Sequence, residues 1–211
     1  IRIRGQKGDK DMTDKIKVGL IFGGNSSEYE VSIMSAHNIY EEIDTNKFDV
    51  YPMWITNDGY LANDEDSRKV LENPKMEVAN PHKVANISNI VELKDRPEID
   101  VFFPIVHGNL GEDGCLQGLF RVLDKPFVGY DVLAAAVTMD KEMTKILAQR
   151  AGVPVAKWIT IKRFEYNDAD NDKLDYEHVA SQLGSDLFVK PSNQGSSVGV
   201  SHVTNEKEYK I

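Results

Sequence analysis

Two short apolar runs, each followed by a glycine-rich polar loop, constrain the fold of this chain more than any other feature. Residues 16–22 read IKVGLIF and residues 100–106 read DVFFPIV. Apolar, β-branched runs of this length are typical of strands buried on both faces of a parallel sheet. A third such stretch lies near residues 49–55, and a helical spacing of apolar residues follows the first run. Together these features predict an open parallel α/β sheet with crossover helices.

The remainder of the first half carries weaker patterns. A helix is expected over residues 116–123 and a short strand over 126–129. Residues 61–96 are polar and weakly periodic, so they predict no more than one or two short elements.

A second unit is expected to begin near residue 136. Its first helix has an apolar stripe and is ended by a glycine, the residues being Met139, Met143, Ile146, Leu147 and Gly152. Strands are expected over 155–161 and 187–191, and a glycine-rich turn runs into another strand over 195–203. Because these strands lack regular crossover helices, the pattern predicts an antiparallel α+β unit.

Two polar loops, 23–28 and 107–114, follow the ends of predicted parallel strands. Ligands bind at this edge of such sheets, so we expect a site between the two loops. The first loop, GGNSSE, matches neither the dinucleotide fingerprint nor a phosphate-binding P-loop. Its residues suit an alternative equally well, in which Ser26 or Ser27 caps a helix and Glu28 complements the helix dipole.

The second loop contains His107 and two adjacent acids, Glu112 and Asp113. Sequence neighbours without a third ligand favour a helix start over a metal site. His107 is compatible with a ligand-binding role or with a hydrogen-bonded core histidine.

Lys190 ends an apolar strand and precedes a Gly-Ser-Ser-x-Gly turn. A lysine is costly to bury unless an anion is its partner, and the turn offers backbone amides and hydroxyl groups. This combination suits a phosphate chain, although an ordinary hairpin with an edge lysine remains an alternative. Periodicity alone does not distinguish Lys141 from a solvated surface lysine.

Composition excludes several partners. Lys and Arg number 25 against 34 Asp and Glu, a net charge of −9, which argues against nucleic acid. The single cysteine, Cys115, fits a reducing compartment. No apolar run approaches the roughly 20 residues that span a bilayer, and no signal-peptide pattern opens the chain. We therefore expect a cytoplasmic protein without a membrane partner.

Five segments, in order and with matching spacing, resemble the D-alanine–D-alanine ligase family of the ATP-grasp superfamily. They are GGNSSEYEVS (23–32), HGNLGEDGCLQG (107–118), MDK (139–141), AGVPVAKW (151–158) and VKPSNQGSSVGVS (189–201). The resemblance implies a Rossmann-like pre-ATP-grasp domain over residues 15–135 and a truncated α+β ATP-grasp central subdomain over 136–211. Residues 1–14 are interpreted as a tag or disordered tail.

The family's activity, by this resemblance, is the ATP-dependent joining of two D-alanines through an acyl phosphate, for peptidoglycan precursors. It implies ATP and Mg²⁺ (or Mn²⁺) as cofactors, D-alanine as substrate, and a homodimer formed through the N-terminal domain. The magnesium ligands and a transition-state arginine are expected beyond Ile211, with none in this chain. The 211-residue chain is therefore expected to be inactive alone.

The resemblance also implies roles for individual residues. Glu28 would hold the ammonium group of the first D-alanine, Ser196 would join Glu28 in a catalytic hydrogen-bond network, and His107 would lie near that substrate. Lys141 and Lys190 would contact the nucleotide phosphates. The ATP-covering turn would consist of Gly195, Ser196, Ser197, Val198 and Gly199.

Three alternatives remain at this point. One is a ligase that makes D-alanine–D-lactate, and another is a non-catalytic module that binds a nucleotide or an amino acid. A different ATP-grasp ligase is disfavoured by segments 23–32 and 107–118.

Overall fold

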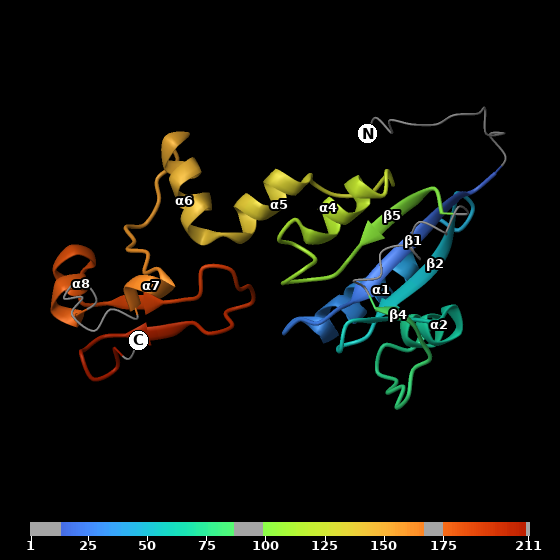
Figure 1. Ribbon diagram of the computed structural model, residues 1–211, viewed down its shortest axis with the longest axis horizontal. Coiled ribbons are helices and arrows are strands. Elements are labelled where there is room, and N and C mark those ends of the chain that lie inside the picture. The colour runs from blue at the N-terminus through green and yellow to red at the C-terminus, as the bar shows by residue number, and fades with distance from the viewer. Residues whose placement is uncertain (1–13, 87–98, 167–174, 210–211) are drawn as a thin grey trace. The chain divides into compact units, whose positions relative to one another are not determined.

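The computed structural model describes residues 14–86, 99–166 and 175–209 (Figure 1). The chain divides into two compact units, residues 1–136 and 137–211. Nearly all of the predicted tail, 1–14, lies outside the described residues. Within the described ranges, no helix is both long and apolar enough to cross a membrane.

A five-stranded sheet forms the centre of the first unit, in the order β4-β3-β2-β1-β5. The central strand β1 (Ile16–Gly23) pairs in parallel with β2 (Phe48–Ile55) and with β5 (Val101–Pro104). The predicted parallel arrangement of these three strands is confirmed. Two short strands, β3 (Tyr60–Ala62) and β4 (Lys83–Asn86), extend the sheet in antiparallel fashion beyond β2.

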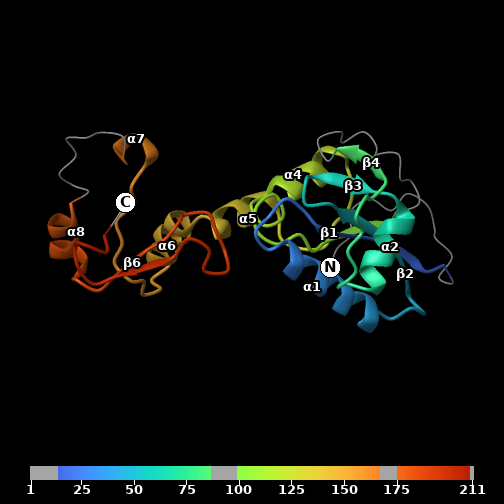
Figure 2. The same cartoon turned by 90° about the horizontal axis from the view of Figure 1, so that it is seen from below.

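Alternation along β1 produces two apolar layers, one on each face of the sheet, and helices lie against both faces (Figure 2). Leu20 and Phe22 point to the layer covered by α1 (Tyr29–Glu42) and α2 (Asp64–Glu72). Ile21 points to the other layer, which includes residues of α4 (Cys115–Val122). A strand with apolar side chains on both faces is stable only when both faces are covered.

The end of the first unit differs from the prediction in two respects. The strand expected over 126–129 is a single parallel bridge between Phe102 and Phe127. Pro126 lacks an amide proton and contributes only its carbonyl, which accepts from Phe102 N at 2.9 Å. A helix that the sequence did not predict, α5 (Val132–Met139), follows.

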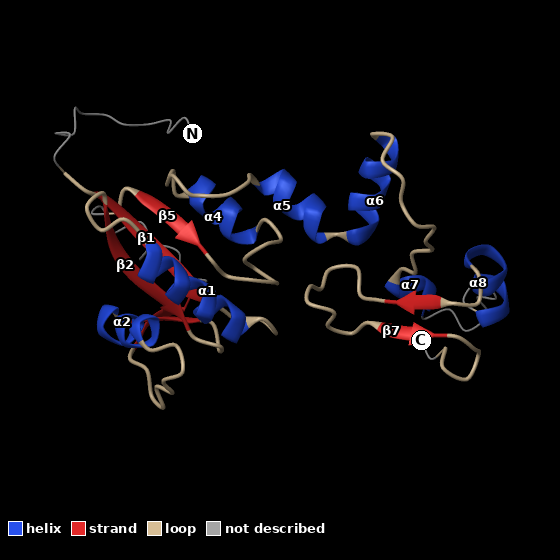
Figure 3. Cartoon of the chain, turned by 180° about the vertical axis from the view of Figure 1, so that it is seen from behind, coloured by secondary structure: helices blue, strands red, loops and turns tan. Residues whose placement is uncertain are grey.

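The second unit combines short helices with a two-stranded antiparallel sheet (Figure 3). Its elements are α6 (Lys141–Arg150), α7 (Arg163–Tyr166), α8 (Tyr176–Leu183), β6 (Leu187–Val189) and β7 (Ser201–Val203). Val179, Leu187 and Val203 form its small core. The strand predicted over 155–161 was wrong, because this segment packs Ile159 against the core but its backbone joins no ladder among the described strands.

Helix α6 ends as predicted but begins only at Lys141, because Met139 of the predicted stripe is the last residue of α5. The Asp140 side chain accepts a hydrogen bond from Met143 N at 2.9 Å, and Gly152 adopts a φ of +80° just beyond the last turn. The apolar stripe does not form a core, however. Ile146 and Leu147 are 41% and 50% exposed, and α6 buries none of its residues.

Candidate functional site

The carboxyl ends of β1 and β5 are joined by Ser32, a fully buried residue of α1. Its hydroxyl oxygen accepts from Gly23 N at 2.8 Å and donates to the carbonyl oxygen of Ile105. One side chain therefore satisfies backbone groups of two adjacent strand ends. It fixes the spacing of the two loops that follow these strands.

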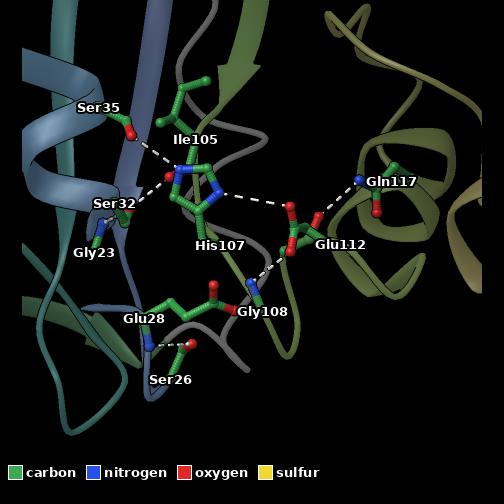
Figure 4. A network of polar contacts seen from close by, with 11 residues as sticks. Gly23, Ser26, Glu28, Ser32, Ser35, Ile105, His107, Gly108, Glu112 and Gln117 are labelled. Atoms are coloured by element: carbon green, nitrogen blue, oxygen red, sulfur yellow. Dashed lines mark hydrogen bonds and ion pairs between the residues drawn. The ribbon is translucent and has the colours of Figure 1, made fainter. Parts of the chain in front are cut away.

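Glu28 occupies the N-cap position of α1 and is 9% exposed. Its side chain makes no capping hydrogen bond, and Ser26 accepts from Glu28 N at 3.0 Å instead. Ser26 therefore accepts from one amide at the start of the helix, as the alternative expected, although Glu28 rather than a serine occupies the N-cap position. The Glu28 carboxylate points toward Gly108 in the neighbouring loop (Figure 4). A negative charge at a helix N-terminus is stabilised by the helix dipole.

Gly108 allows this close approach. A Cβ atom at position 108 would lie 2.9 Å from Glu28 Oε2 and 2.6 Å from Ser26 Oγ. The residue also has a φ of +72°, which glycine adopts without strain. The loop backbone thus lies directly against the buried carboxylate.

His107 connects this loop to α1 (Figure 4). Its Nε2 atom lies 3.0 Å from Ser35 Oγ, and its Nδ1 atom lies 3.5 Å from Glu112 Oε1. Both ring nitrogens are therefore engaged, as in the hydrogen-bonded alternative. Contact of His107 with a substrate stays a prediction.

Glu112 is a structural participant that sequence reasoning missed. Its Oε2 atom accepts from the buried Gly108 N at 2.8 Å, while its other oxygen faces His107. The helix start predicted for both acids belongs to Asp113, which accepts from Cys115 N at 3.0 Å. The spacing of four residues between Gly108 and Glu112, typical of a helical turn, was the available signal.

Asp113 also affects the protonation of the Cys115 thiol. Burial by itself raises the pKa of Asp113, but hydrogen bonds from the amides of Cys115 and Leu110 outweigh it and lower that pKa. The Asp113 carboxylate, together with partial desolvation, raises the pKa of the Cys115 thiol. A thiol that stays protonated is a poor nucleophile.

We expect Glu112→Ala to lower the free energy of unfolding by about 1–3 kcal/mol, because the buried Gly108 amide loses its acceptor. Since a carboxylate only accepts, the neutral His107 ring should carry its proton on Nδ1 in the unaltered chain. The alanine variant should increase the Nε2-protonated form, as seen in imidazole ¹⁵N chemical shifts.

Glu112→Gln is the matched control for this change. Its amide oxygen can still accept from Gly108, so urea denaturation should give a loss below that of the alanine variant. Equal losses for the two variants, with unchanged ¹⁵N shifts, would contradict the role of Glu112.

In the second unit, Lys141 connects α6 to the segment before the glycine-rich turn. Its Nζ atom donates to the carbonyl oxygen of Ser192 at 3.2 Å and to that of Gln194. Lys141 N also donates to Ser192 O at 3.1 Å. Lys141 is therefore held beside the turn for which the sequence predicted a phosphate-binding role.

The turn itself has an unusual backbone. Ser196 and Ser197 have φ values of 46° and 60°, in the left-handed region that non-glycine residues rarely adopt. Gly199 has a φ of 69°, and a Cβ there would lie 2.8 Å from Pro191 Cγ. Strain of this kind often accompanies ligand-binding turns.

Lys190 differs from its prediction in one respect. The residue is exposed rather than buried, and its Nζ atom lies 5.6 Å from the centre of the Phe188 ring. The cost of burial therefore does not explain why a lysine stands here, and its phosphate contact stays a prediction. The residue follows β6 directly because Val189 is the last residue of that strand.

The donor groups of the described residues fit phosphate better than a divalent metal. Lysine ammonium groups and turn amides are phosphate donors. Among residues 14–86, 99–166 and 175–209, no three His, Cys, Asp or Glu side chains are arranged to hold a metal ion. Magnesium prefers carboxylate oxygens, so these lysines and amides would contact the phosphates and not a metal ion.

The predicted site residues fall into two groups. Glu28 and His107 come together in the first unit, on either side of Gly108. Lys141, Lys190 and the turn 195–199 belong to the second unit. Because Glu28 and Ser196 belong to different units, the hydrogen-bond network between them stays a prediction.

Comparison with known proteins identifies the family of this chain. The family model for the D-ala D-ala ligase N-terminus matches residues 17–130, and the model for the C-terminus of the same ligases matches residues 147–211. The chain belongs to the D-alanine–D-alanine ligase family. The resemblance inferred from five sequence segments is thereby confirmed.

Individual members of the D-alanine–D-alanine ligase family have high sequence identity to this chain. The D-alanine--D-alanine ligase of Lactobacillus gasseri is 96% identical over 200 residues, which cover 95% of this chain and 55% of that protein. The chain thus spans about half the length of the curated relatives it matches.

Solved structures of related ligases share the fold. The VanG D-Ala:D-Ser ligase from Enterococcus faecalis has a TM-score of 0.71 and 34% identity, covering 92% of this chain and 57% of that one. The D-alanine-D-alanine ligase from Coxiella burnetii has a TM-score of 0.71 and 33% identity, covering 92% and 58%. The predicted mixed α/β architecture is confirmed.

Proposed function

We propose that this chain provides the amino-acid-binding and phosphate-binding parts of a cytoplasmic D-alanine–D-alanine ligase for peptidoglycan precursors. The observation that carries the proposal is the buried Glu28 carboxylate against Gly108, in a chain 96% identical to a D-alanine--D-alanine ligase. Identity at this level supports the same reaction, and the carboxylate supports a cationic substrate group.

Glu28 would bind the ammonium group of the first D-alanine. A carboxylate with little solvent contact attracts a cation more strongly than an exposed one does, since water screens it less. The contacts of Glu112 with His107 and with Gly108 N hold the adjacent loop in place. The substrate's own carboxylate then remains available for reaction.

In the proposed reaction, an oxygen of that carboxylate attacks the γ-phosphorus of ATP and ADP leaves, which gives an acyl phosphate. The amine of a second D-alanine attacks the acyl carbon and forms the C–N bond. The C–O bond to the phosphate breaks, inorganic phosphate leaves with its electron pair, and the nitrogen loses a proton. Lys141, Lys190 and the amides of 195–199 would position and neutralise the phosphates. Mg²⁺ (or Mn²⁺) would supply further charge neutralisation.

We expect Glu28→Gln to weaken D-alanine binding by about tenfold or more, because a charge-assisted hydrogen bond is lost. In the unaltered chain, D-alanine should shift the NMR amide signals of Ser26, Glu28 and Gly108. L-Alanine is the control ligand and should leave these signals nearly unchanged. Equal responses to both enantiomers, or no response to either, would contradict the proposal.

D-Serine and D-lactate compete with D-alanine as the proposed second substrate. The chain resembles a D-Ala:D-Ser ligase structure and a D-alanine-D-alanine ligase structure almost equally, at 34% and 33% identity. A ligase with D-serine or D-lactate as second substrate is therefore the competing proposal. Competition among D-alanine, D-serine and D-lactate, with products identified by mass spectrometry in protein of the relatives' full length, separates these options.

A homodimer formed through the first unit is part of the proposal. The exposed apolar side chains of Val31 and Met34 on α1 support it, because such side chains are often covered by a partner. Sedimentation equilibrium distinguishes a dimer from a monomer.

A further inference from the structure

Lys145 lies on α6 one turn beyond Lys141, so the two side chains share a helix face. The Lys145 Nζ atom lies 3.4 Å from the carbonyl oxygen of Ala156 and 5.2 Å from the centre of the Trp158 ring. A carbonyl and an aromatic face both attract a cation without neutralising it. These two contacts hold the ammonium group in place.

The positive charge of Lys190 acts on Lys145. Burial, and next the positive charge of Lys190, lower the pKa of Lys145. Lys141 meanwhile contacts the carbonyls of Ser192 and Gln194, only a few residues beyond Lys190. Lys141 and Lys145 share a face of α6, and Lys141 contacts the segment that follows Lys190, so the three positive charges lie in one part of the second unit.

These lysines lack acidic partners in the part of the chain that the structure describes, since no ion pair there involves Lys141, Lys145 or Lys190. Lys162, in the same unit, does have such a partner, the carboxylate of Glu142. The positive charges of these lysines repel one another, and a bound anion would relieve that repulsion. The arrangement suits a ligand with several negative charges along a chain.

We propose that Lys145 is a third phosphate-binding lysine, which acts with Lys141 and Lys190 on one polyphosphate chain. This inference rests on the proposed function, because it adds a residue to the same nucleotide phosphate site. Neither the resemblance nor the sequence pattern assigned a role to Lys145.

The test is a calorimetric titration of the 211-residue chain with sodium tripolyphosphate. Lys145→Met should weaken binding by about tenfold, the effect of losing one charge-assisted contact. Lys162→Met is the matched control, because it removes the same charge from the same unit at a residue paired with Glu142. It should change the affinity less than twofold, or about as little as a remote surface substitution does.

The outcomes distinguish a failure of this inference from a failure of the proposed function. If Lys190→Met weakens binding but Lys145→Met does not, this inference is wrong and the phosphate site stands. If the unaltered chain does not bind tripolyphosphate, the phosphate assignment of the proposed function fails too. Equal losses for the 145 and 162 variants would show a net-charge effect and overturn the inference.

A folding defect would not hide the answer. Near-ultraviolet circular dichroism reports on Trp158, which packs beside Lys145. Lys145→Arg keeps a cation that can stack on the ring and should retain most of the affinity. Loss of binding in a folded Lys145→Arg variant would count against a charge-based role.

Discussion

Replacement of Phe102 by alanine is expected to lower the free energy of unfolding of the first unit by about 3–5 kcal/mol. The side chain is completely buried, and its ring is stacked on Phe120 with centroids 5.1 Å apart. The ring also fills the space beside Gly19, where a Cβ would lie 2.9 Å from it. Domains have about 5–15 kcal/mol of stability in total, so the loss is a large fraction.

Urea denaturation measures this loss. Trp54 fluorescence reports on the first unit, because Trp54 lies in the apolar layer on the other face of the sheet. Val122→Ala is the control, since Val122 is 81% exposed on α4 and should change stability by no more than about 0.5 kcal/mol. A loss below about 1 kcal/mol for Phe102→Ala would show that the ring is not central to the core.

Replacement of Gly111 by alanine is expected to abolish the ordered form of the 107–112 loop. An alanine Cβ would lie 1.8 Å from the carbonyl oxygen of Val106, so the backbone must move. The move would break the bond from Gln117 Nε2 to Gly111 O, which is 2.8 Å long. Because displacements of about 1 Å can cost a hundredfold in function, we expect D-alanine affinity to fall by about that factor.

Gly118→Ala is a matched control on the adjacent helix. A Cβ at position 118 would meet nothing within 4 Å, and alanine favours a helix over glycine by about 0.5–1 kcal/mol. This variant should therefore be at least as stable as the unaltered chain and should bind D-alanine equally well. Calorimetric D-alanine titration, with far-ultraviolet circular dichroism for folding, compares the two. Retained affinity in Gly111→Ala would mean that the loop geometry does not matter for binding.

The sequence predicted the parts of the fold that depend on burial along the chain. Apart from Lys17 and Asp100, residues 16–22 and 100–106 are apolar or glycine, and this pattern identifies central strands without knowledge of their neighbours. The segment 155–161 has a comparable apolar content but forms no strand, because a strand also requires a partner distant in the sequence. The strands β3 and β4 were not individually predicted, since they are only three and four residues long.

The site, like the fold, was predicted only in part. The loops 23–28 and 107–114 were expected together because strand ends of a parallel sheet share an edge, and Gly108 does lie against Glu28. The contacts of Glu112 depend on how its own loop turns, which spacing alone does not determine. The exposure of Lys190 likewise depends on which face of β6 the rest of the unit covers.

The central position of β1 affects how the protein is made. Its first partner, β2, follows closely, but β5 begins only at Val101. During synthesis on the ribosome, the face that carries Ile21 and Met53 must wait for Phe102 and Phe120. Such delayed long-range pairing slows folding and leaves apolar surface open to aggregation. We therefore expect the nascent chain to need chaperone protection until α4 has emerged.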